Sequence, residues 1–261
     1  TQVPMPPVRT FQHTLKLLKE RHKVELTKIT NPDLYRSTLA PSGRGMLRHV
    51  TAANQMWQID ASPVDALCID GRHVVYVCLD IATRRMITFV SRTARASAVA
   101  LLIRKAILAW GVPQLIKTDN GSDFVARDTQ RLFAALDIEA ETSIAYTPQQ
   151  KGHVERAIRT LQHGVAPLLP GYIGHDVTER KAIESRKAFA QRLGESDEKI
   201  FCVALTGQQL QAYFDQWVDI VYQHRPHAGL DDRTPFQAAL ASAEVIRRVD
   251  ERALDLLLMP V

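Results

Sequence analysis

The stretch MWQIDASPVDALCIDGRHVVYVCLDIATRRMITFVS, residues 56–91, decides the fold of this chain. It holds three runs rich in β-branched and aromatic residues, separated by Asp70-Gly71 and by the polar sequence TRR at 83–85. Asp-Gly between two apolar runs is a strong signal for a two-residue hairpin turn. The stretch therefore predicts three consecutive strands in an antiparallel meander, at residues 56–69, 73–81 and 86–91.

The period of the apolar residues changes after this meander. From Val99 to Trp110 they recur at the spacing of an amphipathic helix, which Gly111 and Pro113 should end. A meander followed by alternating strands and helices predicts an α/β fold: a mixed five-stranded sheet with helices on both faces. The remaining elements are expected as a strand at 114–119, a helix at 126–137, a strand at 138–144 and a helix from His153.

Helices and a linker are expected outside the sheet. Residues 8–22 predict a basic helix, and 23–50, with two prolines and two glycines, predict an irregular linker. A long helix is expected at 206–224, and Thr234-Pro235 should cap a further one. The helix from His153 should bury a stripe made of Val154, Ile158, Leu161, Val165 and Leu168.

The positive charge of the chain is concentrated at one end. The 261 residues carry a net charge of +5, but residues 1–50 hold nine Lys or Arg against three acids, and the remainder holds 24 against 25. A basic arm on a nearly neutral body favours a polyanion partner, most simply nucleic acid, over a solvated linker without a partner.

The same composition bears on the environment of the chain. No run approaches the roughly 20 apolar residues of a membrane span, and no signal region is visible. Three cysteines without a CxxC pair argue against a disulfide framework or a zinc knuckle and fit a reducing cytoplasm. Because it opens TQVPMPP without an initiator methionine, the chain is expected to be a fragment of a longer protein.

Three carboxylates stand out against this fold. Asp60 follows the apolar part of the first strand, Asp119 ends the fourth, and Glu155 falls in the first turn of a later helix. The sequence DNG at 119–121 is also ordinary turn chemistry, so Asp119 alone does not decide between a turn and a ligand. Three acids at one point repel one another unless a cation compensates them. Oxygen ligands suit Mg²⁺ or Mn²⁺, and two such ions can support phosphoryl transfer.

These motifs resemble those of a known family. WQIDAS around Asp60, KTDNGSDF around Asp119 and YTPQQKGHVER around Glu155 are similar, in this order, to the acidic motifs of DDE transposases and retroviral-type integrases. Thirty-five residues separate Asp119 from Glu155, as in the D–35–E interval of that family. YQHRPHAGLDDRTPFQAAL, residues 222–240, resembles the H-x-x-L…TP end of its cores, so that the resemblance covers about residues 54–242.

The resemblance implies a fold, an activity and a metal requirement. The fold would be RNase H-like, with the catalytic core at 51–242. The activity would be nicking at the 3′ end of a mobile element, followed by attack of that 3′-OH on target DNA. Asp60, Asp119 and Glu155 would hold two Mg²⁺ or Mn²⁺ ions, with Asp60 bridging them. An RNase H-like nuclease or resolvase without strand transfer, and a non-catalytic DNA-binding module, are the alternatives.

Within the family the chain looks most similar to bacteriophage Mu-type transposases. Residues 1–50 would be the end of a DNA-binding region, and 243–261 would lead into a further C-terminal domain. That similarity implies double-stranded DNA, a homo-oligomer on DNA and an ATPase target-selection protein as partners, in the cytoplasm of a bacterial host. The chain departs from relatives in lacking an HHCC zinc module, in a charged insert at 170–205, and in carrying Lys151 where many have Gln.

DNA contacts are expected from three regions. The basic arm, the loop before Glu155 and arginines of the core are placed to meet backbone phosphates, although a solvated loop and surface remain alternatives. The candidates are Lys16, Lys19, Lys23, Arg84, Arg85, Arg95, Tyr146, Gln149, Gln150, Lys151 and Arg159.

Overall fold

A computed structural model of the chain describes residues 6–35, 47–143, 151–175, 178–179, 181–183, 185 and 202–258. The chain forms two compact units. One consists of Thr1–Gly45 with Ile144–Gln150, and the other of Met46–Ser143 with Lys151–Val261. The sheet and the three acidic motif residues all belong to the second unit.

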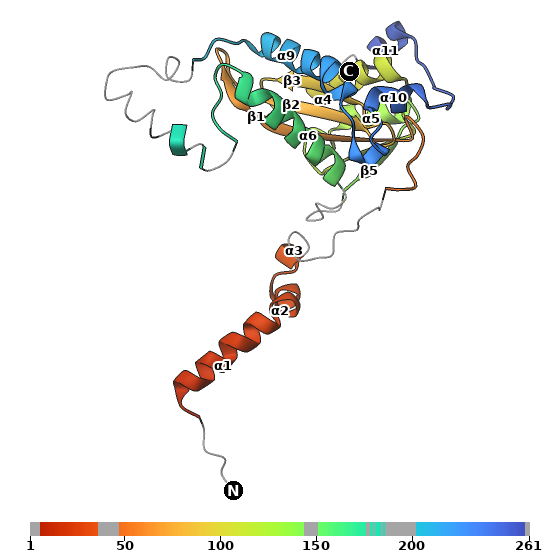
Figure 1. Ribbon diagram of the computed structural model, residues 1–261. Helices are drawn as coiled ribbons and strands as arrows, with labels where there is room; N and C mark the ends of the chain where they lie inside the picture. The colour runs from red at the N-terminus through yellow and green to blue at the C-terminus, as the bar shows by residue number, and fades with distance from the viewer. Residues whose placement is uncertain are drawn as a thin grey trace. The chain divides into compact units, whose positions relative to one another are not determined.

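The sheet of the second unit has five strands in the order β3-β2-β1-β4-β5 (Figure 1). β1 and β3 each pair antiparallel with β2, whereas β4 pairs parallel with β1 and with β5. This confirms the predicted meander and the mixed five-stranded sheet, which has the RNase H-like arrangement. The strands are β1 Met56–Cys68, β2 Gly71–Asp80, β3 Met86–Ser91, β4 Leu115–Thr118 and β5 Glu139–Thr142.

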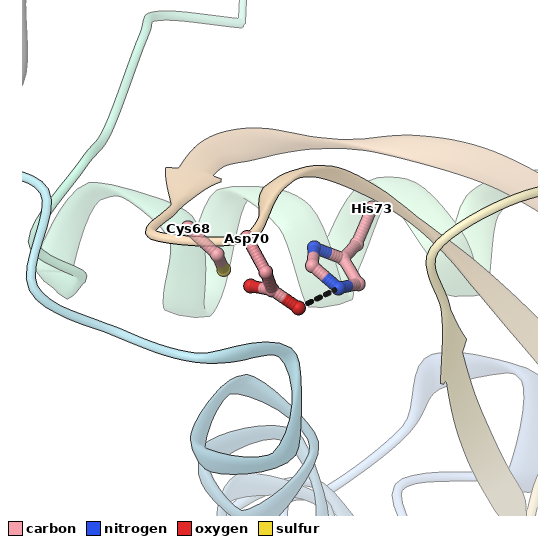
Figure 2. A group of neighbouring side chains, drawn as sticks. All are labelled: Cys68, Asp70 and His73. Carbon is pink, nitrogen blue, oxygen red and sulfur yellow. Dashed lines mark ion pairs between the residues drawn. The ribbon is translucent and has the colours of Figure 1, made fainter.

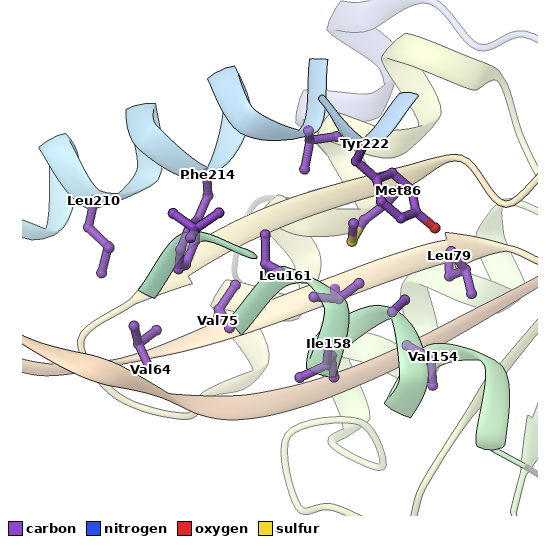
Figure 3. Packing of buried hydrophobic residues seen from close by; sticks show 14 of the residues in the cluster. Val64, Val75, Leu79, Met86, Val154, Ile158, Leu161, Leu210, Phe214 and Tyr222 are labelled. Carbon is purple, nitrogen blue, oxygen red and sulfur yellow. The ribbon is translucent and has the colours of Figure 1, made fainter. Parts of the chain in front are cut away.

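Helices cover both faces of the sheet, as expected. α4 (Ala96–Trp110), α5 (Arg127–Ala135) and α11 (Glu251–Leu258) contribute to one hydrophobic core. α6 (Gly152–Val165) and α9 (Gly207–Ile220) pack on the other face, where Leu161 and Phe214 are fully buried (Figure 3). Shorter elements are η3 Ala166–Leu168, η4 Tyr222–His224, η5 Ala228–Leu230 and α10 Pro235–Leu240, the last with the capping box expected at Thr234.

The alternation along β1 explains why one strand serves both cores. Trp57 and Ile59 point into the core under α4, whereas Met56 and Val64 belong to the core under α6. Gln58 is fully buried although it is polar, and it lies between the two apolar residues that face α4. A buried amide needs hydrogen-bond partners. We therefore expect the backbone of another element to approach Gln58 on the face of the sheet opposite to α4.

Some details differ from the prediction. Residues 23–34 are largely helical, in α2 (Lys23–Thr30) and α3 (Pro32–Leu34), so the irregular linker predicted from residue 23 is wrong there. Leu168 is 79% exposed, because η3 turns the chain away from the stripe that α6 buries. Residues 36–46 and most of the charged segment 175–200 lie outside the described residues.

The C-terminal part is joined to the core. Leu254 of α11 is fully buried, and Arg104 of α4 donates to both Glu251 (2.7 Å) and Asp255 (2.6 Å). The first unit is helical, with α1 (Val8–Arg21) as its longest described helix. None of the helices in the described ranges is long and apolar enough to cross a membrane.

Candidate active site

Strand pairing brings the first two carboxylates together. β1 and β4 run parallel, with Gln58 opposite Lys117 as their last registered pair. Asp60 and Asp119 each lie two residues beyond that pair, Asp60 within β1 and Asp119 directly after the end of β4. Residues two apart on a strand face the same side. Asp60 therefore shares the face of Gln58, on which α6 packs.

The start of α6 is held against the same face. The backbone amide of Val154, which is fully buried, donates to the side-chain oxygen of Gln58 at 3.3 Å. Glu155 follows directly, half-buried in the first turn of the helix. A hydrogen bond to the residue two positions before Asp60 thus places the third carboxylate beside the first.

Lys151, just before α6, supplies positive charge between the two aspartates. Its Nζ lies 2.9 Å from Asp60 Oδ1 and 3.2 Å from Asp119 Oδ2, and the lysine is only 7% exposed. A nearly buried ammonium is stable only when carboxylates compensate it. The point between Asp60 and Asp119 is therefore already a cation position.

Asp119 is both a turn residue and a site residue. Its Oδ1 accepts a hydrogen bond from the backbone amide of Gly121 at 2.8 Å, which closes the turn, while its Oδ2 faces Lys151. The two readings of DNG at 119–121 do not compete, because each carboxylate oxygen serves one of them.

The surroundings of Glu155 destabilise its charged form. Burial raises the pKa of Glu155 above its ordinary value, and the neighbouring charge of Asp60 raises this pKa further. Lys151 and Arg159 act in the opposite direction without cancelling the effect. The charged form of Glu155 is thus disfavoured where it stands, as expected for acids that share one point without enough positive charge.

The donor set fits a hard divalent cation. It offers carboxylate oxygens alone, which suit Mg²⁺ and Mn²⁺, and Lys151 already holds a positive charge between two of the acids. The three carboxylates do not form a group whose oxygen atoms all lie within 4.8 Å of one another, however. Among the described residues, the group of potential ligands whose donor atoms all lie within 4.8 Å is instead Cys68, Asp70 and His73.

That second group lies at the turn between β1 and β2 (Figure 2). Asp70 faces His73 Nε2 at 3.1 Å through Oδ2, and its Oδ1 accepts from the Gly207 amide at 3.2 Å. His73 Nδ1 lies 3.0 Å from the carbonyl oxygen of Gly71. Burial raises the pKa of the Cys68 thiol to about 11, which keeps it protonated at neutral pH. The polar atoms of Asp70 and His73 thus have protein partners, and we assign no ion to this group.

The predicted DNA contacts are found in different environments. Arg85 is committed to the protein interior, because it pairs with buried Asp80 at 3.0 Å and stacks on Trp110. This arrangement argues against the phosphate contact expected of Arg85. Arg84 lines a pocket, and Lys151 faces the aspartates. The exposed candidates are Lys16, Lys19 and Lys23 of the first unit and Arg95 and Arg159 of the second, whereas Tyr146, Gln149 and Gln150 lie outside the described residues.

Two site residues escaped the sequence analysis in their present roles. Lys151 was expected to meet DNA, and its ion pair with Asp60 depends on a contact between residues 91 apart in the chain. Gln58 was not singled out at all. The one available signal was a polar residue on the inward face of an otherwise apolar strand.

Comparison with known proteins gives one family match and several relatives. Residues 50–148 match the family described as Integrase core domain, a segment that contains Asp60 and Asp119 and ends before Glu155. The Intracisternal A-particle Pol-related polyprotein of mouse intracisternal a-particle MIA14 is 34% identical over 109 residues, which are 41% of this chain and 12% of the polyprotein. The transposase for transposon Tn552 of Staphylococcus aureus is 28% identical over 153 residues, 53% of this chain and 32% of the transposase.

A solved structure supports the fold. A chain in the structure of the simian T-cell lymphotropic virus intasome in complex with PP2A regulatory subunit B56 gamma has a TM-score of 0.53 and 18% identity. The match covers 83% of this chain and 66% of that chain. The chain thus spans less than two thirds of the length of each of these proteins. Residues 50–148 are similar to an integrase core domain, within an RNase H-like fold and with relatives among retroviral polyproteins and a bacterial transposase.

Proposed function

We propose that this protein is a divalent-metal-dependent DNA transposase or integrase of the DDE type. The observation that carries the proposal is that Asp60 of β1 and Asp119, directly after β4, share the ammonium of Lys151, with the charge of Asp60 acting on Glu155. The match of residues 50–148 to an integrase core domain supports the same reaction class. The reaction would be hydrolytic nicking at the 3′ end of an element, followed by attack of the new 3′-OH on a target phosphodiester.

Asp60, Asp119 and Glu155 would hold the metal, with two Mg²⁺ or Mn²⁺ ions as the full complement. When bound, such ions supply activation of the attacking oxygen and neutralise charge on the phosphodiester. No side-chain nucleophile is then required. Lys151 would leave the aspartates and become available to a DNA phosphate, with Arg159, Tyr146, Gln149 and Gln150 as further candidates along the strand.

The partners are part of the proposal. Double-stranded DNA would be bound both as element end and as target, by a homo-oligomer assembled on it. By analogy with Mu-type transposases, an ATPase would select the target, and the protein would act in the cytoplasm of a bacterial host as the product of a phage or mobile element.

Two other functions are separable by experiment. A nuclease or resolvase with the same acids would cut DNA and join nothing, so strand transfer from pre-nicked ends distinguishes it. A non-catalytic DNA-binding module would bind no divalent ion at the carboxylates, which metal titration by calorimetry would reveal.

Asp119→Asn should lower both nicking and joining by more than about 100-fold, since even changes next to a metal ligand typically cost about 10–100-fold. The fold should persist, because the amide oxygen can still accept from Gly121. The measurements are a nicking and joining assay in Mg²⁺ and a thermal melt. Asp137→Asn, at a fully exposed carboxylate, is the control and should react like the wild type. Near wild-type joining by Asp119→Asn would leave Asp119 as a turn residue only.

Lys151→Gln should destabilise the protein only while metal is withheld. Loss of the ammonium leaves Asp60 and Asp119 to repel each other. By analogy with other charged hydrogen bonds, this should lower the free energy of unfolding by about 1.5–3 kcal/mol. We expect a lower melting temperature in EDTA, recovery in Mg²⁺, and tighter Mn²⁺ binding by calorimetry.

The matched control is Lys117→Gln. Lys117 is also nearly buried, but it pairs with Glu141 at 2.6 Å and not with any of the three motif carboxylates. The Lys117→Gln variant should lose stability in EDTA and in Mg²⁺ alike. Equal behaviour of the two variants would show that Lys151 does not occupy a metal position.

Glu155→Gln should melt at or above the wild-type temperature at neutral pH in EDTA. A carboxyl whose folded pKa is raised destabilises the folded state above its unfolded pKa, and this penalty disappears as pH falls below both values. The advantage of the variant should therefore shrink between neutral pH and roughly pH 4, the usual range of an unfolded Glu. A melting temperature well below wild type at pH 7 would instead indicate a structural ion pair with Arg159.

Deletion of residues 1–50 should weaken DNA binding and reduce its salt dependence. These residues carry the whole positive balance of the chain. If about four of the nine basic residues each neutralise a phosphate, the slope of log K against log salt should fall by roughly 3.6. This slope is obtained by measuring duplex binding at several salt concentrations. Metal binding should persist in the deletion variant. An unchanged slope would mean that the arm is a linker.

A further inference from the structure

A pocket of about 300 Å³ lies beside the candidate active site, on another side of α6. It is enclosed by α6, by the turn between β2 and β3, and by the segment around η4 and η5. Among the described residues that line it there is no Asp or Glu. The nitrogen-bearing side chains that line it are Arg84, His153, Arg156, Arg225 and His227.

Arg84 has two buried side-chain nitrogens without a hydrogen-bond partner in the described structure, more such atoms than any other residue there. Its Nε and Nη1 are buried and have no hydrogen-bond acceptor among the described residues. The adjacent Arg85 pairs with Asp80, and both carboxylate oxygens of Asp80 accept hydrogen bonds. Asp80 Oδ2 accepts from Arg85 and from the Asn54 amide, and Oδ1 accepts from the Ala82 amide. A buried guanidinium without an acceptor is costly, so an anion is the missing partner.

The backbone at Arg84 is strained in a way that a smaller residue would avoid. Its φ is +59°, a left-handed conformation that a glycine adopts more readily. The conformation carries the side chain into the pocket, where a Cβ placed on Gly229 would come within 3.7 Å of Arg84 Nε. Strain at a position with an orphaned guanidinium is typical of a binding site.

His227 adds a neutral donor to this set. Its Nδ1 accepts a hydrogen bond from the backbone amide of Gly229 at 3.0 Å, so the neutral ring carries its proton on Nε2. Burial, followed by the charges of Arg84 and Arg156, lowers the pKa of His227 and favours that neutral form. The pocket thus combines the forked N–H groups of arginine with a ring N–H. Arginine forks match the geometry of phosphate oxygens.

The pocket is separate from the carboxylates although one helix serves both. His153, Arg156, Ala157 and Thr160 recur at helical spacing on the pocket side of α6, and Glu155 is not part of that stripe. An anion here would not meet the acids, which repel it.

We propose that this pocket is an anion site that binds a phosphate group through Arg84, with Arg156, Arg225 and His227 as its further donors. The phosphate is either a free one or a phosphodiester of a bound DNA strand. The second source rests on the proposed function, whereas binding of inorganic phosphate does not.

The first arm of the test is titration of the full chain with inorganic phosphate in EDTA, by calorimetry and thermal melting. We expect saturable binding and stabilisation, at least about tenfold weaker in Arg84→Gln, since a lost charged hydrogen bond is worth roughly 1.5–3 kcal/mol. Arg84→Lys should bind weakly, because it keeps the charge without the fork. Arg248→Gln, at an exposed arginine away from the pocket, should bind like the wild type.

Arg156→Gln serves if Arg84→Gln does not fold, because Arg156 is exposed on α6 and its loss removes no buried contact. It should weaken phosphate binding in a folded protein. Absence of phosphate binding by the wild type, or binding unchanged in Arg84→Gln and Arg156→Gln, would overturn the proposal.

The second arm separates the two sources. If the site takes a DNA phosphodiester, phosphate should compete with duplex DNA, and Arg84→Gln should lower the salt slope of duplex binding by about one. If it takes free phosphate, duplex binding should be the same in both proteins. Both arms are run without metal, so a failure of the proposed catalytic function, seen with Asp119→Asn, leaves their result intact.

Discussion

The candidate site depends on one constraint, the parallel pairing of β1 with β4 in a fixed register. Gln58 lies opposite Lys117, and Asp60 and Asp119 follow two residues later on their two segments, where both face Lys151. A shift of one residue would turn either aspartate to the other face of the sheet, since side chains alternate along a strand. The apolar residues that precede the two aspartates prevent that shift, because Trp57, Ile59 and Ile116 must all remain in the core under α4.

The charges of the second unit divide into satisfied and unsatisfied groups. Arg85 with Asp80, and Lys117 with Glu141, are complete pairs near the core. The motif acids are not complete, because one lysine serves two aspartates and Glu155 keeps a raised pKa. Arg84 is incomplete in the opposite sense, because its buried Nε and Nη1 have no acceptor among the described residues. The incomplete acids and the incomplete arginine lie on different sides of α6.

Lys151 gives this site a property that the motif acids alone would not have. An ammonium between Asp60 and Asp119 lowers the repulsion that would otherwise destabilise the folded chain. Under the proposed function, the same charge would have to be displaced before a divalent ion could bind there. The Lys151 side chain would then raise the stability of the metal-free protein and lower its affinity for metal.

Much of the fold and the identity of the acids followed from the sequence. The Asp-Gly turn, the change of period after residue 91 and the capping signal at Thr234 depend on local backbone preferences, which a sequence displays directly. The motifs around Asp60, Asp119 and Glu155 could be read in the same way, because their residue types and spacing are properties of the chain.

Only the tertiary structure decided which partners those residues have. Arg84 and Arg85 are adjacent and chemically identical, yet one pairs with Asp80 and the other is left in a pocket, because the left-handed turn points them to different surroundings. Lys151 likewise looked like a loop residue for DNA and lies between two aspartates. Sequence determines local conformation and residue chemistry, whereas burial and pairing between distant segments depend on how the elements pack.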